Sequence, residues 1–325
     1  MRRLLLPVLG MLLATPLFAA KSAYEYYAVG SQSDVTRTTT AGTVFMGGGT
    51  DVDAAFQWMI GKSGGGDFVV IRATGTDAYN PYIYALGTVD SVETLIIKSR
   101  TAAADPFVIA KIRNAEALWI AGGDQSDYIN FWKGTPVADA INYVANTKHA
   151  PVGGTSAGLA VLGQFIYTGA TGSVTSSQAL ANPYNRYVTL DRDFVQIANT
   201  TGLFTDSHFV TRDRLGRLVT FLARVIKDGW ASSAHGLGID EQTAILVNPD
   251  GSATRVGNGA AYFLTSAGVP QTCVANTPLT YTGLAVYKVS GAATFNLATW
   301  TGSGGLAYTV STNAGALSSS NGSIY

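Results

Sequence analysis

The residue best suited to chemistry is Ser156, at the centre of Gly154-Thr-Ser-Ala-Gly158, a G-x-S-x-G pattern. Apolar segments on both sides predict a short strand, a sharp turn and the start of a helix, which together form a nucleophile elbow. Glycines two residues either side remove the Cβ atoms that would clash in such a turn. The pattern alone is weak, and a glycine-rich turn with an incidental serine remains the alternative.

A serine nucleophile needs a general base, and the chain has three histidines. His149 precedes the predicted elbow strand and would lie at its far end. His208 and His235 both lie in predicted connections between elements. Position along the chain favours His208, which comes just before a long predicted helix. A lone histidine is more often structural, so His235 remains the alternative.

The base needs a carboxylate that orients it, and Glu241 and Asp240 are the candidates. Both lie in Gly238-Ile-Asp-Glu-Gln-Thr-Ala244, directly before an apolar segment that predicts a strand. Adjacent side chains of an extended chain point to opposite sides, so only one of them can face the histidine. A solvated acidic turn is the alternative interpretation of this segment.

Strands and helices that alternate along the chain would position these residues. Alternation of this kind predicts right-handed crossovers and a parallel sheet. Glycine loops that begin at Gly47, Gly122 and Gly153 follow three of the strands, so we expect them at the carboxyl edge of the sheet, where such folds bind ligands. None of them matches a nucleotide-binding motif. The predicted strands are 43–46, 67–71, 93–97, 117–121 and 243–247, and the predicted helices are 51–62, 105–114, 136–146 and 212–228.

The fold class that follows is α/β, a three-layer α/β/α sandwich with a mostly parallel sheet and a small C-terminal β appendage. We expect a signal peptide over 1–20, a catalytic domain over 21–270 and a β-rich extension over 271–325. Residues 21–40 are polar and are expected to be irregular. In the extension, alternating segments at 284–289 and 306–310 predict antiparallel strands.

Composition excludes several classes of protein. The 325 residues are 47% hydrophobic and 13% charged, which predicts a large core rather than disorder. The formal net charge is zero, so there is no basic field for nucleic acid. The one cysteine, Cys273, cannot form an intrachain disulfide and has no histidine nearby in sequence, so we expect a structural thiol. There is no metal-ligand spacing, and we expect neither a metal nor a cofactor.

The first residues resemble a secretory signal peptide. Two arginines precede an apolar run over 4–13 and a short segment that ends at Ala20. A membrane helix is the alternative, but the run is short and contains Pro7 and Gly10. Phe18 fits the small-residue rule for cleavage poorly, which leaves the cleavage site open. The sequence therefore predicts export to the periplasm or beyond, with no membrane attachment after cleavage.

Four blocks in the chain resemble the cyanophycinase family, serine peptidases related to aspartyl dipeptidase. The resemblance covers residues 43–265 and is specific only for the blocks taken together. It implies a fold like that of class I glutamine amidotransferases. The blocks are Gly-Gly-Asp-Gln at 122–125, Gly-Thr-Ser-Ala-Gly at 154–158, Asp-Ser-His-Phe with Arg-Asp-Arg-Leu-Gly-Arg at 206–217, and Gly-Ile-Asp-Glu-Gln-Thr-Ala at 238–244.

The resemblance implies a Ser156–His208–Glu241 triad that acts on cyanophycin, a polyaspartate with arginine on each side-chain carboxyl, or on related β-aspartyl peptides, with release of β-Asp-Arg dipeptides. The expected oxyanion donors are the N–H of Ala157 and an N–H of Gly123 or Asp124. The remaining expected contacts to substrate are Gln125, Asp206, Arg212, Arg214 and Arg217.

The three arginines have two interpretations from the sequence. Cations are unfavourable at a helix N-terminus because of the helix dipole, which suggests that these arginines have another role. Their forked guanidinium groups would bind the carboxylates of an aspartate backbone. The alternative is a solvated start of the helix, and Arg217 is also compatible with a purely structural role. Two other functions stay open: an esterase of the α/β-hydrolase class and a non-catalytic binding protein. The sequence does not fix the oligomeric state, and a homodimer remains open.

Overall fold

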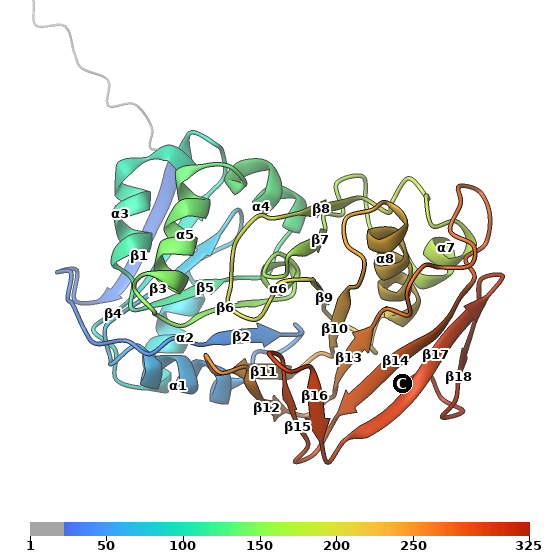
Figure 1. Cartoon of the computed structure of the whole chain (residues 1–325). Coiled ribbons are helices and arrows are strands. Elements are labelled where there is room, and N and C mark those ends of the chain that lie inside the picture. The colour runs from blue at the N-terminus through green and yellow to red at the C-terminus, as the bar shows by residue number, and fades with distance from the viewer. Residues whose placement is uncertain (1–22) are drawn as a thin grey trace, which may run out of the picture.

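A computed structural model describes residues 23–325, so the predicted signal peptide lies outside the described residues (Figure 1). The chain forms two large sheets, with helices packed against both. Ten strands make the first sheet, in the order β1-β4-β3-β5-β6-β2-β11-β12-β15-β16. Their bounds are β1 Tyr24–Gly30, β2 Thr43–Met46, β3 Asp67–Arg72, β4 Ser91–Ile97, β5 Ala117–Ile120, β6 Val152–Thr155, β11 Thr243–Val247, β12 Ser252–Gly257, β15 Thr294–Asn296 and β16 Thr301–Ser303.

The centre of the first sheet is parallel and its flanks are antiparallel. Strands β4, β3, β5, β6 and β2 pair in parallel. Strand β1 is antiparallel to β4, and β11, β12, β15 and β16 continue the other side in antiparallel pairs. The predicted α/β class is confirmed, but the expectation of a mostly parallel sheet is corrected to a mixed one.

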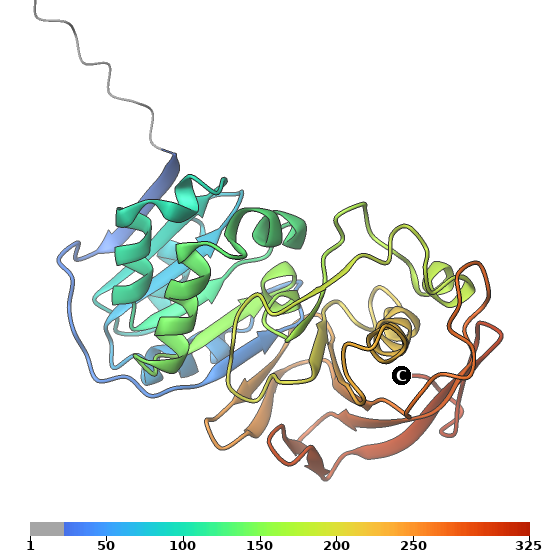
Figure 2. The same ribbon diagram turned by 45° about the horizontal axis from the view of Figure 1, so that its top comes forward.

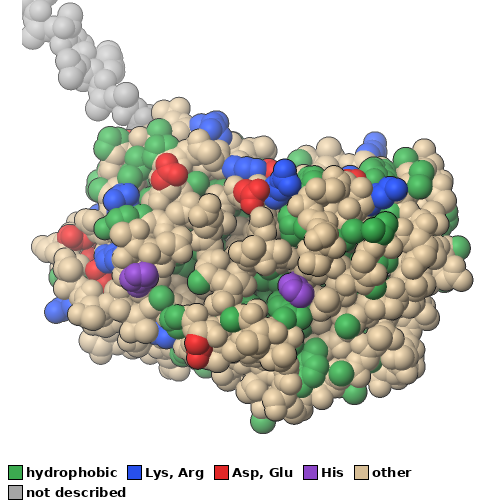
Figure 3. Space-filling model, in the orientation of Figure 1, with side chains coloured by type: hydrophobic (Ala, Val, Ile, Leu, Met, Phe, Trp, Pro, Cys, Tyr) green, Lys and Arg blue, Asp and Glu red, His purple; other side chains and the backbone are tan. Residues whose placement is uncertain are grey.

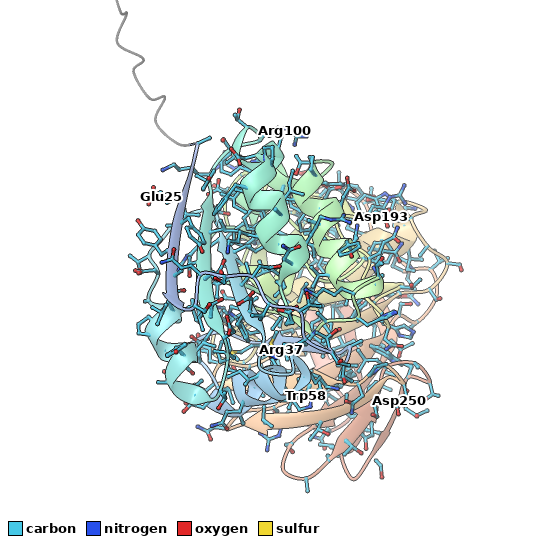
Figure 4. The ribbon with its side chains drawn as sticks, turned by 90° about the vertical axis from the view of Figure 1, so that its left-hand side faces the viewer. Glu25, Arg37, Trp58, Arg100, Asp193 and Asp250 are labelled. Carbon is cyan, nitrogen blue, oxygen red and sulfur yellow. The ribbon has the colours of Figure 1, made fainter. Side chains whose placement is uncertain are left out.

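Buried, continuous apolar runs explain the parallel strands, because helices cover both of their faces. Alternate residues of β3 face opposite sides: Val69 and Ile71 join the core under α3 and α5, while Phe68 and Val70 join the core under α1 and α2. Figure 4 views this half from the side on which β1 and Glu25 lie. The helices of this half are α1 Asp53–Lys62, α2 Tyr79–Leu86, the 3₁₀ turn Ala102–Ala104, α3 Pro106–Asn114, α4 Gln125–Trp132, α5 Pro136–Asn146 and α6 Ala157–Ala160.

Eight strands make the second sheet, in the order β18-β17-β14-β13-β10-β9-β7-β8. Helix α8 (Leu215–Lys227), seen nearly end-on in Figure 2, packs against β9 and β10, and α7 (Ser176–Ala181) lies beside it. Only β9 pairs in parallel, with β10 and β7. The strands are β7 Phe165–Tyr167, β8 Leu190–Arg192, β9 Leu203–Asp206, β10 His235–Ile239, β13 Ala261–Thr265, β14 Tyr281–Val289, β17 Leu306–Asn313 and β18 Ala316–Ser319.

The strands after residue 271 extend both sheets. Strands β14, β17 and β18 continue the second sheet from β13, while β15 and β16 continue the first from β12. The expected antiparallel pairing is confirmed, with Leu284 opposite Val310. The division of the chain into a catalytic domain and an extension stays a prediction.

Two predicted segments differ from the structure. Residues 24–30, expected to be irregular, form the edge strand β1, in which Tyr24 and Tyr26 pack against the core beside Phe107. The long helix begins at Leu215 rather than at residue 212, because the preceding residues form a tight turn described below. Within residues 23–325, no helix combines the length and apolar character needed to cross a membrane.

Candidate active site

Ser156 lies in the sharp turn between β6 and α6, with φ 53° and ψ −112°. This backbone conformation is strained for a non-glycine residue and costs about 1–3 kcal/mol. The surrounding glycines are needed: a Cβ on Gly158 would lie 2.0 Å from the carbonyl oxygen of Ile120, and one on Gly154 would lie 2.6 Å from the backbone of Gly158. The Ser156 N–H donates to the Met46 carbonyl at 3.1 Å. The predicted elbow is therefore present in the structure.

The three side chains expected to act together lie in one hydrogen-bonded row. The Ser156 Oγ is 2.7 Å from Nε2 of His208, and Nδ1 of His208 is 2.5 Å from Oε1 of Glu241. His208 follows the end of β9, and Glu241 follows the end of β10. Because these neighbouring strands are parallel, their carboxyl ends bring residues 33 positions apart in sequence together.

A glycine turn after β2, residues Gly47 to Gly49, packs against the His208 ring and hydrogen-bonds to the backbone of His208 and Gln242. The N–H of His208 donates to the Gly47 carbonyl at 2.7 Å, and the N–H of Gln242 donates to the Gly48 carbonyl at 2.8 Å. A Cβ on Gly48 would lie 2.4 Å from Cε1 of the His208 ring. Gly48 has a φ of +99°, which also favours glycine. The sequence placed this turn at the correct edge but gave it no role.

The surroundings of His208 favour the neutral form of its imidazole. Its side chain is 7% exposed, and burial is the main cause that lowers its pKa below the ordinary value. The guanidinium groups of Arg212 and Arg214 lower the pKa further, whereas Glu241 acts in the opposite direction. The lowered pKa keeps the ring uncharged near neutral pH, so Nε2 is able to accept a proton from the serine.

A pocket of about 230 Å³ opens beside the serine. Its lining is mostly polar and joins the elbow to the segment after β9. Ala157 is the first residue of α6, and N–H groups of a first helical turn have no partner within the helix. The lining residues expected from the sequence are Gly123, Asp124, Gln125, Ala157, Asp206, Arg212, Arg214 and Arg217, and the structure brings all eight together around Ser156.

Arg217 is held by Asp206 inside this pocket. Its Nε donates to Oδ2 of Asp206 at 2.7 Å, its Nη2 contacts Oδ1, and both side chains are 3% exposed. Arg214 lies 3.5 Å from Oδ1 of the same carboxylate and donates to the Ser207 carbonyl at 2.9 Å. Burial lowers the pKa of Arg214 to about 10. Arg212 is the more accessible of the two outer arginines, with a side chain 54% exposed and its Nε 3.9 Å from Oε1 of Glu241, whereas the side chain of Arg214 is 13% exposed.

The alternatives left open by the sequence are placed elsewhere. Asp240 accepts from the backbone and hydroxyl of Thr211 and does not face the histidine. The ring of His235, at the opposite end of β10, stacks on Trp300 with 3.8 Å between ring centres. His149 lines a separate cavity beyond the start of β6.

Two other expectations concern cysteine and metals. Cys273 is buried, and burial raises the pKa of its thiol to about 11, so it is an inert thiol. In the part of the chain that the structure describes, no group of three or more His, Cys, Asp or Glu side chains is arranged to hold a metal ion.

The face shown in Figure 3 carries few charged side chains. Some of them, of both signs, gather at the upper centre of this view.

The sequence of the chain is similar to those of known cyanophycinases. The chain is 28% identical over 220 residues to the cyanophycinase of Trichormus variabilis, a match that covers 64% of this chain and 66% of that protein. It is 27% identical over 223 residues to the cyanophycinase of Synechococcus elongatus, covering 65% of this chain and 62% of the relative. The chain is thus similar in sequence to curated cyanophycinases over about two thirds of its length. The matches span just under two thirds of the length of these relatives.

No family model matches the chain. The solved structure of a peptidase from an acI-B1 Actinobacterium is similar over 69% of this chain and 91% of its own, with 17% identity and a TM-score of 0.49.

Proposed function

We propose that this cyanophycinase relative is an exported serine peptidase that hydrolyses cyanophycin or related β-aspartyl peptides and releases β-Asp-Arg dipeptides. The observation that carries the proposal is the row Ser156–His208–Glu241, with distances of 2.7 and 2.5 Å, beside a pocket lined by Arg212 and Arg214. The names of the relatives supply the substrate class.

The reaction would follow from the geometry. The Ser156 Oγ attacks the scissile carbonyl carbon while Nε2 of His208 takes the hydroxyl proton. Glu241 holds the Nδ1 proton of the ring and stabilises the imidazolium that forms. His208 then gives its proton to the leaving amine, which leaves an acyl ester on Ser156. Water, activated by the same histidine, hydrolyses the ester and restores the hydroxyl.

Developing negative charge on the carbonyl oxygen needs donors beside the serine. The Ala157 N–H and an N–H of Gly123 or Asp124 are the proposed donors, because all three residues line the pocket at Ser156. Loss of one such donor costs about 10²–10³ in rate.

The charge of the pocket favours a carboxylate ligand. Arg212 and Arg214 would bind substrate carboxylates, and Gln125, which also lines the pocket, would contact the peptide. An esterase acting on acyl chains would need an apolar channel, and the charged lining here argues against one. We expect Arg217 to act mainly by fixing Asp206, since its guanidinium is already engaged.

Export is part of the proposal because of the N-terminal residues. An arginine pair followed by an apolar run fits a signal peptide. Secretion into the medium or the periplasm would bring the enzyme to polymer outside the cytoplasm.

The test is product release from purified cyanophycin. Products are identified by mass spectrometry, and we expect the Ser156→Ala variant to release no β-Asp-Arg. The control is Ser177→Ala, which removes an exposed hydroxyl outside the pocket and should release β-Asp-Arg at the wild-type rate. Undiminished release by Ser156→Ala would contradict the mechanism. Hydrolysis of p-nitrophenyl esters without peptide cleavage would instead support the esterase alternative.

A further inference from the structure

Between His208 and α8 the chain makes a tight turn that carries two of the pocket arginines, Arg212 and Arg214. The N–H of Arg212 donates to the His208 carbonyl at 3.0 Å, and the N–H of Arg214 donates to the Phe209 carbonyl at 2.8 Å. Between the two arginines, Asp213 has a φ of 47°. A non-glycine residue in this left-handed region persists only where its surroundings hold it. The turn therefore depends on contacts from outside its own sequence.

Tyr325, 110 residues beyond the start of α8, supplies one of these contacts. Its hydroxyl donates to Oδ1 of Asp213 at 2.9 Å and accepts the N–H of Leu215 at 3.0 Å. Leu215 is the first residue of α8, and the preceding Arg214 gives no side-chain cap to the helix. The tyrosine thus does for α8 what an N-cap side chain usually does, from a distant part of the chain.

The ring of Tyr325 is itself fixed. It packs edge-on against Phe209 and Tyr262, with ring centres 5.9 and 5.8 Å away. The segment that leads to it is tied to β17 by the hydroxyl of Tyr308, which donates to the Ile324 carbonyl at 3.0 Å. On the other side of the turn, the Ser176 hydroxyl donates to the Asp213 carbonyl. Asp213 is therefore held from two sides.

The direction of the Asp213 side chain matters for the charge of the pocket. Arg212 and Arg214 line the pocket, whereas Asp213 does not. Asp213 makes no ion pair within residues 23–325. A carboxylate released between two arginines would be free to pair with either of them and would compete with a carboxylate ligand.

We propose that Tyr325 is a positioning residue for substrate binding: its hydroxyl holds Asp213 away from the pocket and fixes the turn that presents Arg212 and Arg214. The inference rests on the proposed function, because it assumes that these arginines bind the carboxylates of the substrate. It extends that function by assigning substrate specificity to Tyr325, which lies far in sequence from the four motifs but contacts the third of them.

The first experiment compares Tyr325→Phe with Tyr184→Phe. Both changes remove only a hydroxyl that donates to an aspartate next to α8, since Tyr184 bonds to Asp228 at 2.7 Å beyond the other end of the helix. We expect Tyr325→Phe to raise KM for cyanophycin about three- to tenfold with kcat nearly unchanged, because the lost interaction affects binding rather than the triad. Tyr184→Phe should leave KM unchanged.

Labelling of Ser156 by an uncharged fluorophosphonate separates positioning from general damage. The probe has no carboxylate, so its reaction rate in Tyr325→Phe should equal that of the wild type. An unchanged KM in active Tyr325→Phe, an equal rise of KM in Tyr184→Phe, or a matching loss of labelling would each overturn the proposal.

A second readout does not depend on peptidase activity. Trypsin cleaves after arginine, and a loosened turn should be cut after Arg212 or Arg214 several times faster in Tyr325→Phe than in the wild type or Tyr184→Phe. Wild-type rates of cutting in Tyr325→Phe would overturn the positioning role even if cyanophycin proved not to be a substrate. Failure of the proposed function itself would show separately, as Ser156→Ala activity equal to that of the wild type.

Discussion

Replacement of Gly48 by alanine probes the support beneath His208. The added methyl would lie 2.4 Å from Cε1 and 2.6 Å from Nε2 of the ring. Carbon atoms in ordinary contact lie about 3.5 Å apart, so ring and methyl must separate by about 1 Å. The ring is fixed by bonds of 2.7 and 2.5 Å and by the His208 N–H bond to Gly47, so it cannot move this far and keep all three.

We expect Gly48→Ala to lower kcat about 100-fold or more, since a 1 Å displacement of a catalytic group costs about that much. This factor corresponds to about 2.7 kcal/mol in the activation free energy. KM should change little, because the pocket arginines are not touched. The positive φ of residue 48 adds a cost in stability of about 1–3 kcal/mol, which thermal unfolding would measure.

The assay is the steady-state release of β-Asp-Arg, together with the rate of fluorophosphonate labelling at Ser156. Gly61→Ala is the matched control, because Gly61 lies in α1 and no atom is within 4 Å of the added methyl. A folded Gly48→Ala protein with the kcat of the wild type would refute the claim that this glycine turn fixes the base.

Three further predictions concern charge and the rejected histidine. Arg212→Ala removes a cation near His208 and should therefore raise the pKa of the imidazole, which moves the acid limb of the kcat/KM pH profile to higher pH. The control Arg100→Ala should leave this limb in place. An unmoved limb in Arg212→Ala would argue against His208 as the base. Asp206→Asn leaves Arg217 buried and unpaired, so it should lower the free energy of unfolding by about 3–5 kcal/mol in a denaturant titration. Asp191→Asn removes a partly exposed ion pair and should cost about 1 kcal/mol or less. Equal losses in the two variants would contradict the burial argument. His235→Gln should keep kcat within about twofold, since its ring stacks on Trp300 at the far end of β10, and a large loss of kcat would mean that the base has been misassigned.

Much of the parallel core is predictable because its signals are local. The helix over 136–146 and the strand over 243–247 match the structure residue for residue, and both carry strong apolar patterns with clear ends. Helix α4 was not predicted, although Asp124 caps it through a hydrogen bond to the N–H of Ser126. The helix is short and its first turn is polar, so the apolar periodicity that indicates a helix is weak there.

The edge strand β1 escaped prediction for a different reason. Its Tyr24-Glu-Tyr-Tyr alternation is brief and only partly buried, so the polar residues around it dominate the composition. The aromatic residues were the available signal, since they favour strands.

In the candidate site, the sequence identified side chains but not the backbone that holds them. Ser156, His208 and Glu241 were reachable through motifs, and the structure places them in one row. The role of Gly48 depends on how closely two loops approach, and a residue without a side chain carries no pattern for that. The contact of Tyr325 with Asp213 joins residues 112 apart and has no local signature.

The central claim is that Ser156 is a nucleophile activated by His208. The most direct measurement is mass spectrometry of the protein after reaction with a fluorophosphonate. The account predicts one covalent adduct, located on Ser156, with peptidase activity lost in proportion and labelling strongly slowed in His208→Ala. An adduct on another residue, or an unreactive Ser156 in protein that still cleaves cyanophycin, would contradict it.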